Sequence, residues 1–239
     1  SREPASLWIA TVDAPSADDA GVGSDVAVVN LGGDSVYDTG HELFHRAPGA
    51  GLACASCHGE GAEDGHVWVF SGQGQRRTQA VHIGLAGTEP FHWDGELADM
   101  GALMEEVMVS RMGGVHQSID RGNALQDWLF SIKAPAPLRL AGDASALRGK
   151  QLFEGTGGCT QCHSGAKLTN NQTIDVGTGK AFQVPSLVGV GHRGPWLHDG
   201  CAKTLQERFD PLCGGSNHGQ VAQLAAPQID DLVAYLETL

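Results

Sequence analysis

Two short stretches decide how this chain folds: Cys54-Ala55-Ser56-Cys57-His58 and Cys159-Thr160-Gln161-Cys162-His163. Each stretch holds two thiols with two residues between them, followed at once by a histidine, which is the C-x-x-C-H pattern of covalent haem c attachment. The thiols add to the haem vinyl groups as thioethers, and the histidine can bind the iron from one face. The sequence therefore predicts two covalently attached haem c groups, with His58 and His163 as iron ligands.

Two other kinds of site also use paired cysteines. A zinc cluster could take four thiolates from the two motifs, and a single C-x-x-C could be a redox dithiol. Zinc does not require a histidine after each second cysteine. A redox dithiol normally stands alone before a helix of a βαβ unit, and the sequence pattern indicates no such unit. Haem attachment is therefore the favoured interpretation.

The composition fits a protein whose core is filled partly by a cofactor. Of the 239 residues, 41% are hydrophobic but only 6% are aromatic, and 34 are glycine. Haem is a large flat hydrophobe that can replace the missing bulky side chains. No apolar run reaches the roughly 18 residues that a membrane-spanning helix needs. The net charge of −13 argues against binding of nucleic acid. It suits a partner redox protein whose own surface is basic.

The two cysteine motifs belong to an internal repeat. Cys159 lies 105 positions after Cys54, and Asp199-Gly200 lies 105 positions after Asp94-Gly95. A constant offset over several motifs is typical of duplicated units. Each unit is expected to hold an opening helix, the C-x-x-C-H turn, glycine-rich loops and a closing amphipathic helix, at 124–132 in the first unit and 228–239 in the second.

The expected fold is all-α, with cytochrome c-type haem domains in tandem at 37–134 and 141–239. The prolines of Ala134-Pro135-Ala136-Pro137 end the preceding helix and mark a linker. Residues 1–36 lie outside the repeat, and their β-branched stretches at 7–12 and 25–31 predict two short strands. These strands could form a hairpin or end a longer protein's β-domain. No signal peptide is visible, and maturation would remove one from a c-type cytochrome.

Three further stretches carry a family resemblance: Val184-Pro185-Ser186-Leu187, Gly194-Pro195-Trp196-Leu197-His198-Asp199-Gly200 and Asp231–Leu236. On these residues, and on their weaker copies in the first half, residues 37–239 resemble the di-haem cytochrome c peroxidase superfamily. Its relatives include the di-haem enzyme that matures methylamine dehydrogenase. The resemblance implies two cytochrome c folds, a periplasmic or otherwise exported location and electron transfer between haems. It does not by itself imply peroxidase activity, because function belongs to the site.

The sixth ligand of each iron decides between electron transfer and peroxide chemistry. The first half holds all four methionines of the chain, spaced four apart at positions 100, 104, 108 and 112. Such a stripe is also typical of core packing. The family places its distal methionine in this segment, so Met112 is the expected ligand of the first iron. The alternatives are Met108, His92, His116 and His66.

The second half has no methionine. Cys213 stands at the position that matches Met112, and it follows Cys201 closely, so an oxidising compartment favours a Cys201–Cys213 disulfide over a thiolate ligand. His218 is then the expected distal ligand of the second iron, with His198 or an open position as alternatives. The family's usual pattern puts methionine on the second haem, so this chain departs from it.

Four other residues are candidates for contact with haem. Arg76 and Arg77 lie where basic groups could pair with haem propionates, although surface solvation explains them equally well. Trp93 and Trp196 flank the Asp-Gly motifs and could pack on the haem faces or lie between the haems. No catalytic residue is assigned. Electron transfer is the first hypothesis, reduction of hydrogen peroxide the second, and a binding or sensing module the third. The sequence does not determine whether calcium lies between the domains.

Overall fold

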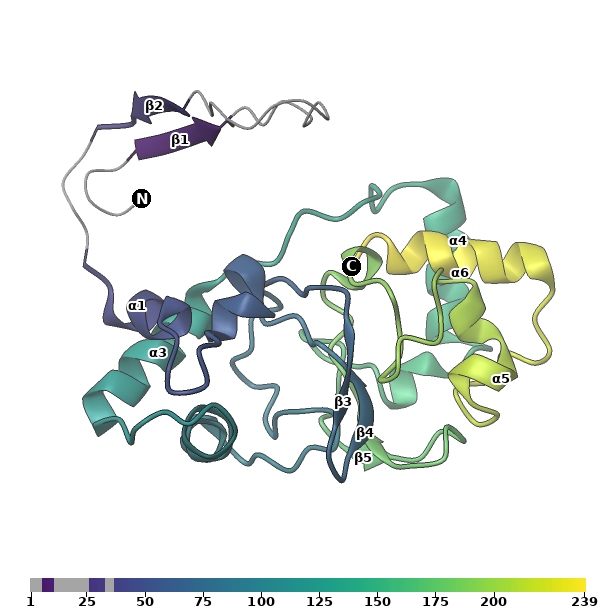
Figure 1. Cartoon of the computed structure of the whole chain (residues 1–239). Coiled ribbons are helices and arrows are strands. Elements are labelled where there is room, and N and C mark those ends of the chain that lie inside the picture. Colours follow the sequence, from purple (N-terminus) through teal and green to yellow (C-terminus); the bar gives the residue numbers. More distant parts are fainter. Residues whose placement is uncertain (1–5, 11–25, 33–36) are drawn as a thin grey trace, which may run out of the picture. The chain divides into compact units, whose positions relative to one another are not determined.

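The computed structural model describes residues 6–10, 26–32 and 37–239 (Figure 1). The chain divides into two units, Ser1–Thr39 and Gly40–Leu239. In the first unit, β1 (Ser6–Ala10) and β2 (Val26–Asn30) pair as an antiparallel hairpin. The two strands predicted from β-branched residues are thus confirmed.

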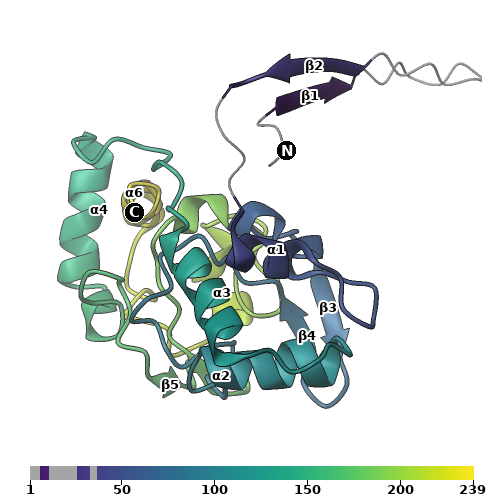
Figure 2. The ribbon, with the colours of Figure 1, turned by 90° about the vertical axis from the view of Figure 1, so that its left-hand side faces the viewer.

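The second unit is mostly helical, and its halves begin and end with helices where the repeat predicts them. The first half opens with α1 (Thr39–His45) and closes with α3 (Ile119–Ser131). The second opens with α4 (Ala144–Glu154) and closes with α6 (Ala226–Leu236), which lie against each other in Figures 1 and 2. Asp143 caps α4, because its carboxylate accepts from the amides of Ser145 and Ala146.

Each opening helix meets its closing helix at a glycine. A Cβ at Gly149 would lie 1.8 Å from the carbonyl oxygen of Asp231, and one at Gly40 would lie 2.1 Å from that of Ala124. Only glycine lets the two backbones come so close. One turn further on, aromatic rings meet in both halves: the centroids of Phe44 and Trp128 are 4.7 Å apart, and those of Phe153 and Tyr235 are 5.1 Å apart. The duplication is therefore present in the packing.

The loops repeat as well. His92 and Leu197, 105 positions apart, both have a backbone φ of 70°. Just before and after them, Phe91 forms a β-bridge with Leu97, and Trp196 forms one with Ala202. The backbone thus follows the same path twice around the Asp-Gly motifs.

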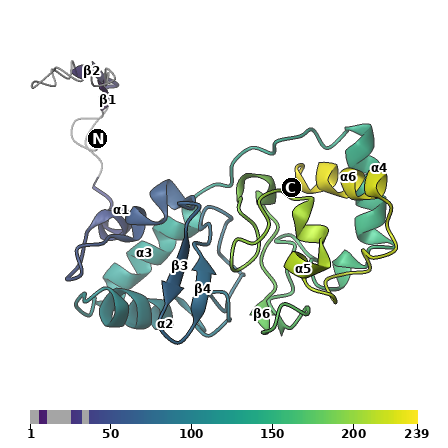
Figure 3. The ribbon, with the colours of Figure 1, turned by 45° about the vertical axis from the view of Figure 1, so that its right-hand side comes forward.

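The all-α expectation was too simple, because two small hairpins stand where glycine-rich loops were expected. They consist of β3 (Val67–Phe70) with β4 (Gly74–Arg77), and β5 (Thr173–Ile174) with β6 (Phe182–Gln183) (Figure 3). Their ends join the two halves. The amide of Arg77 donates to the carbonyl of His198 at 2.6 Å, and the amide of Gln183 donates to the carbonyl of Trp93 at 2.8 Å.

The methionine stripe lies on α2 (Met100–Leu103) and on the π-helix Met104–Arg111 that continues it. The amide of Met112 donates to the carbonyl of Val107, five residues earlier, at 3.0 Å. The wider π turn keeps a spacing of four residues on one face. Met100, Met104 and Met108 are buried on that face, whereas Met112 is half-buried.

The predicted linker lies between α3, which ends at Ser131, and α4, which begins at Ala144. Residues 40–239 nevertheless form one unit, so the separate domains 37–134 and 141–239 stay a prediction. Among the described residues, no helix has both the length and the apolar character needed to cross a bilayer.

Candidate haem-binding sites

Both C-x-x-C-H motifs form the same tight turn. Cys54–Ser56 and Cys159–Gln161 are short 3₁₀ turns. The amide of His58 donates to the carbonyl of Cys54 at 2.9 Å, and the amide of His163 donates to that of Cys159 at 2.8 Å. In each motif the turn brings two unbridged thiols and the following imidazole together, which is the arrangement that thioether attachment needs.

The second motif opens into an apolar cavity, which is called the second cavity because it belongs to this motif. Cys159, Cys162 and His163 line it together with His218. Apolar side chains form most of the remaining wall: Ile174, Val176, Phe182, Val184, Leu187, Val190, Leu205, Phe209, Leu232 and Leu236. A cavity bordered by two thiols and two imidazoles, with walls of this kind, fits a covalently bound haem.

The imidazole rings of His163 and His218 both line this cavity, and the distance between their centroids suits a metal ion between them. Their centroids are 6.3 Å apart and their planes are inclined by 26°. Metal–imidazole bonds are about 2 Å long. Because a ring centre lies roughly 1 Å behind its nitrogen, two imidazoles on one metal ion have centroids about 6 Å apart. The spacing therefore suits two axial ligands of a single iron.

Hydrogen bonds also prepare both rings for ligation. Nδ1 of His163 donates to the carbonyl of Leu168 at 3.0 Å, and Nδ1 of His218 donates to that of Gly214 at 3.1 Å. Each ring is then left with an unprotonated Nε2, the tautomer that metal-bound histidines use. Burial lowers the pKa of His163 to about 4 and holds the pKa of His218 well below its usual value. Both imidazoles are therefore neutral near pH 7.

Two arginines that were not predicted from the sequence line the same cavity: Arg193 is buried and Arg208 is half-buried. Burial lowers the pKa of Arg193 and that of Arg208 to about 10. Nε of Arg193 has no hydrogen-bond partner among the described residues, and a guanidinium of Arg208 donates to the carbonyl of His218 at 3.3 Å. Haem propionates are anions that would satisfy such cations. For Arg193, the available signal was its place in the largely apolar stretch 184–197.

Arg76 and Arg77, the cations chosen from the sequence, already have carboxylate partners. Arg76 pairs with Asp94 at 3.2 Å, and Arg77 pairs with the buried Glu63. Burial raises the pKa of Glu63, while Arg77 opposes that shift. Arg77 also lines the second cavity. Pairing of these arginines with propionates stays a prediction.

The two tryptophans chosen from the sequence, Trp93 and Trp196, both line the second cavity, although Trp93 belongs to the first half. The indole of Trp93 donates to the carbonyl of Arg77 at 2.7 Å, and that of Trp196 donates to the carbonyl of Val190 at 2.9 Å. The ring of His198 stacks on Phe182 with centroids 4.0 Å apart, beside Trp93. His198 thus lines the cavity as part of an aromatic cluster.

The first motif lies against the core that holds the methionine stripe. Cys54 packs on the buried cluster that includes Met108. The carbonyl of Met112 accepts from the amide of Ala50 at 2.8 Å, which places Met112 near the start of the haem-binding segment. Of the alternative ligands, His66 and His116 are exposed, and His92 contacts Glu96 at 3.2 Å.

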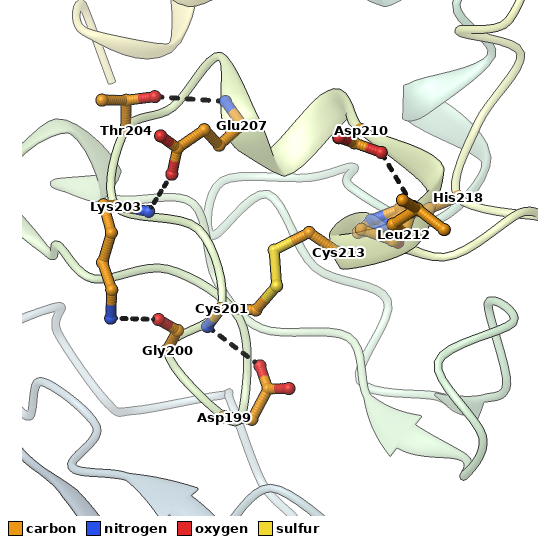
Figure 4. The surroundings of a disulfide bond; sticks show 11 residues. Asp199, Gly200, Cys201, Lys203, Thr204, Glu207, Asp210, Leu212, Cys213 and His218 are labelled. Carbon is orange, nitrogen blue, oxygen red and sulfur yellow. Dashed lines mark hydrogen bonds between the residues drawn. A yellow bond between two sulfur atoms is a disulfide. The ribbon is translucent and has the colours of Figure 1, made fainter.

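The predicted disulfide is present. Cys201 and Cys213 are bonded, with their Cα atoms 5.7 Å apart. Figure 4 shows that the bond ties the Asp199–Cys201 loop to α5 (Pro211–Gly214). Gly214, at the end of α5, supplies the carbonyl that holds the ring of His218. The disulfide therefore anchors the segment that orients this imidazole.

Reduction of the Cys201–Cys213 bond is expected to lower the free energy of unfolding by about 3 kcal/mol, because the unfolded chain regains the entropy of an open loop. Guanidinium titrations with and without dithiothreitol measure the effect. Haem thioethers resist the reductant, so only this bond responds. A Cys201→Ser/Cys213→Ser variant should be insensitive to dithiothreitol, and equal stability of the oxidised and reduced protein would refute the prediction.

Comparisons with known proteins agree with these observations. The cytochrome c family model matches residues 146–239. The methylamine utilization protein MauG of Methylorubrum extorquens is 27% identical, with 79% of this chain and 72% of that protein covered. A cytochrome-c peroxidase of Denitromonas iodatirespirans is 24% identical, with 89% and 81% covered.

A solved structure shares the fold. A chain of the hydrazine synthase of Kuenenia stuttgartiensis superposes with a TM-score of 0.75 at 22% identity, and the match covers 84% of this chain and 86% of that one. The paired turns, the repeated helix crossings and these matches identify the chain as a member of the di-haem cytochrome c peroxidase superfamily that includes MauG, with covalently bound c-type haems.

Proposed function

We propose that this di-haem redox protein transfers electrons between two haem domains, at 37–134 and 141–239, and that His163 and His218 both bind the second iron. The two imidazoles, with centroids 6.3 Å apart, carry the proposal. Two imidazoles that both held the iron would leave no place for peroxide. The haem supplies one-electron chemistry when bound, and the chain's own residues hold it, exclude water and fix its ligands.

The two sites are proposed to differ in reduction potential. Imidazole on both faces gives a lower potential than imidazole with a thioether, because thioether is a weaker donor to ferric iron. We assign His58 and Met112 to the first iron. Met108, which lies buried in the cluster beside Cys54, is the alternative. With haem bound, His163 and His218 would hold the second site at the lower potential, so electrons would pass from it to the site of His58 and Met112.

The segment between the two cofactors would come from both halves. Trp93 lines the second cavity, and its indole donates to the carbonyl of Arg77. The backbone of Arg77 in turn donates to the carbonyl of His198. These contacts hold the two sites in fixed relation, so that neither needs to move for electrons to pass.

Reduction of hydrogen peroxide is the second candidate. It is favoured by the relative from Denitromonas iodatirespirans that is named as a cytochrome-c peroxidase. In that case the first haem would have an open or displaceable sixth ligand, and the second would deliver electrons to it.

Visible and electron paramagnetic resonance spectra of the oxidised and half-reduced protein, followed by a peroxide assay with a reduced donor, separate the two candidates. Electron transfer predicts only low-spin iron in both states and no turnover of peroxide. A high-spin signal that appears at half reduction, together with turnover, would replace the first proposal with the second.

We further propose an exported, oxidising location, which is supported by the disulfide. The net charge of −13 suits a redox partner with a basic surface, because opposite charges steer such encounters.

A further inference from the structure

Helix α1 and the segment after the first haem motif bring three metal-binding side chains together. His41 and His45 lie four residues apart on α1, so both imidazoles project from one face of the helix. Glu60 reaches the same place from the turn Gly59–Gly61. One ligand atom from each of the three side chains lies within 4.8 Å of the other two.

The hydrogen bonds of His45 show why a cation belongs at this place. Nδ1 of His45 lies 2.8 Å from the carbonyl of His41, and Nε2 lies 2.9 Å from a carboxylate oxygen of Glu60. Both oxygens are acceptors, so Nδ1 must carry a proton. A neutral imidazole would then turn the lone pair of Nε2 toward a carboxylate, which is repulsive. A proton on Nε2 satisfies this contact, and a metal ion bound to both side chains would do so once the two atoms move apart from 2.9 Å to roughly 3.4 Å.

The imidazole of His41 favours a metal ion over a proton in this cluster. The ring of His41 stacks on that of His45 with centroids 3.9 Å apart and planes 22° from parallel. The edge of Trp128 holds the His41 ring in place, with centroids 5.3 Å apart. A proton is shared by two atoms only, Nε2 of His45 and a carboxylate oxygen of Glu60. A transition-metal ion can bind the imidazole of His41 as well. Nδ1 of His45 donates to the carbonyl of His41, and metal-bound histidines commonly make such a hydrogen bond with their other ring nitrogen.

The backbone conformation of Glu60 and the exposure of its side chain also fit a binding site. Glu60 has φ 48°, a left-handed conformation that is uncommon for residues with a side chain. The residues on either side of it, Gly59 and Gly61, are glycines. The Glu60 side chain is 78% exposed and that of His45 is 30% exposed, so a dissolved ion can reach the cluster and the carboxylate can adjust to it.

We propose that His41, His45 and Glu60 bind a divalent transition-metal ion, with Zn²⁺ as the best fit. Two imidazoles and one carboxylate form a ligand set that Zn²⁺ uses in proteins, with a further position left for water. Ligand atoms of a tetrahedral zinc ion lie roughly 3.4 Å apart, so small side-chain movements close the site. Calcium and magnesium prefer oxygen ligands and should not compete.

The test is calorimetric titration of the holoprotein, with both haems attached and free metals removed, with ZnCl₂ in a non-coordinating buffer. One Zn²⁺ per chain should bind, and millimolar Ca²⁺ should not displace it. His45→Gln should weaken binding at least tenfold. Cu²⁺ offers a second readout, because two imidazole ligands give nitrogen hyperfine structure in its electron paramagnetic resonance spectrum, which His41→Gln should reduce to that of one ligand.

A matched pair of variants isolates the site. Glu60→Gln removes a carboxylate that contacts one histidine of a pair. Glu105→Gln removes a carboxylate that contacts the exposed His116 at 3.0 Å, outside the proposed ligand set. Only Glu60→Gln should weaken binding of Zn²⁺. Equal affinity in both variants, or no binding to the unmodified protein, would overturn the proposal. Since Glu60 is exposed, this comparison holds even if a histidine variant does not fold.

Discussion

Replacing His218 with alanine is expected to turn the second haem from low spin to high spin. The ring centroids of His218 and His163 are 6.3 Å apart, a separation that suits one iron between them, so removal of His218 would leave the sixth position open or filled by water. About half of the low-spin ferric signal should disappear, because the second haem changes its spin state while the first haem stays low-spin. Visible and electron paramagnetic resonance spectra of the oxidised protein measure the change.

Two controls accompany the His218→Ala variant. Free imidazole should enter the vacated space and restore the low-spin signal, which a change in folding would not allow. His192→Ala removes another histidine of the same half, one whose Nε2 bonds the carbonyl of Ala136 at 2.8 Å. That variant should keep the parent spectrum. An unchanged spectrum in His218→Ala would show that another residue, such as His198, is the ligand.

Replacing Gly149 with alanine is expected to destabilise the second half by about 3 kcal/mol, because overpacking forces α4 and α6 apart. The added methyl would lie 1.8 Å from the carbonyl oxygen of Asp231. The matched change is Gly122→Ala on α3, where a Cβ meets nothing within 4 Å. There alanine should stabilise by roughly 0.5–1 kcal/mol, since glycine is a poor helix residue.

Guanidinium unfolding of the three proteins, followed by circular dichroism, compares the two glycines directly. Effects of opposite sign support a helix crossing that requires glycine at position 149. A similar small effect of both alanines would contradict the close approach of α4 and α6.

The sequence predicts the parts of the site that depend on short motifs and on the repeat. The C-x-x-C-H turns follow from local chemistry, and the offset between Cys54 and Cys159 places the opening and closing helices of both halves. His218 was predicted only by elimination, once Cys201 and Cys213 were paired with each other. The structure shows the disulfide and places the ring of His218 6.3 Å from that of His163, while iron ligation by His218 stays a prediction.

The features that were missed depend on contacts between distant segments. Arg193 and Arg208 were not predicted, because only the folded chain brings both of them to the second cavity. The hairpin of β3 and β4 was hidden by its length of four residues per strand and by its glycines. Its final strand is fixed by hydrogen bonds to the loop at His198, far along the chain.

The most direct test is the intact mass of the denatured protein after production in a host that attaches haem c. We predict the mass of the polypeptide plus two haem groups, and a loss of one haem in a Cys159→Ala/Cys162→Ala variant. A mass equal to that of the bare chain, or a double variant that still carries both groups, would contradict the account.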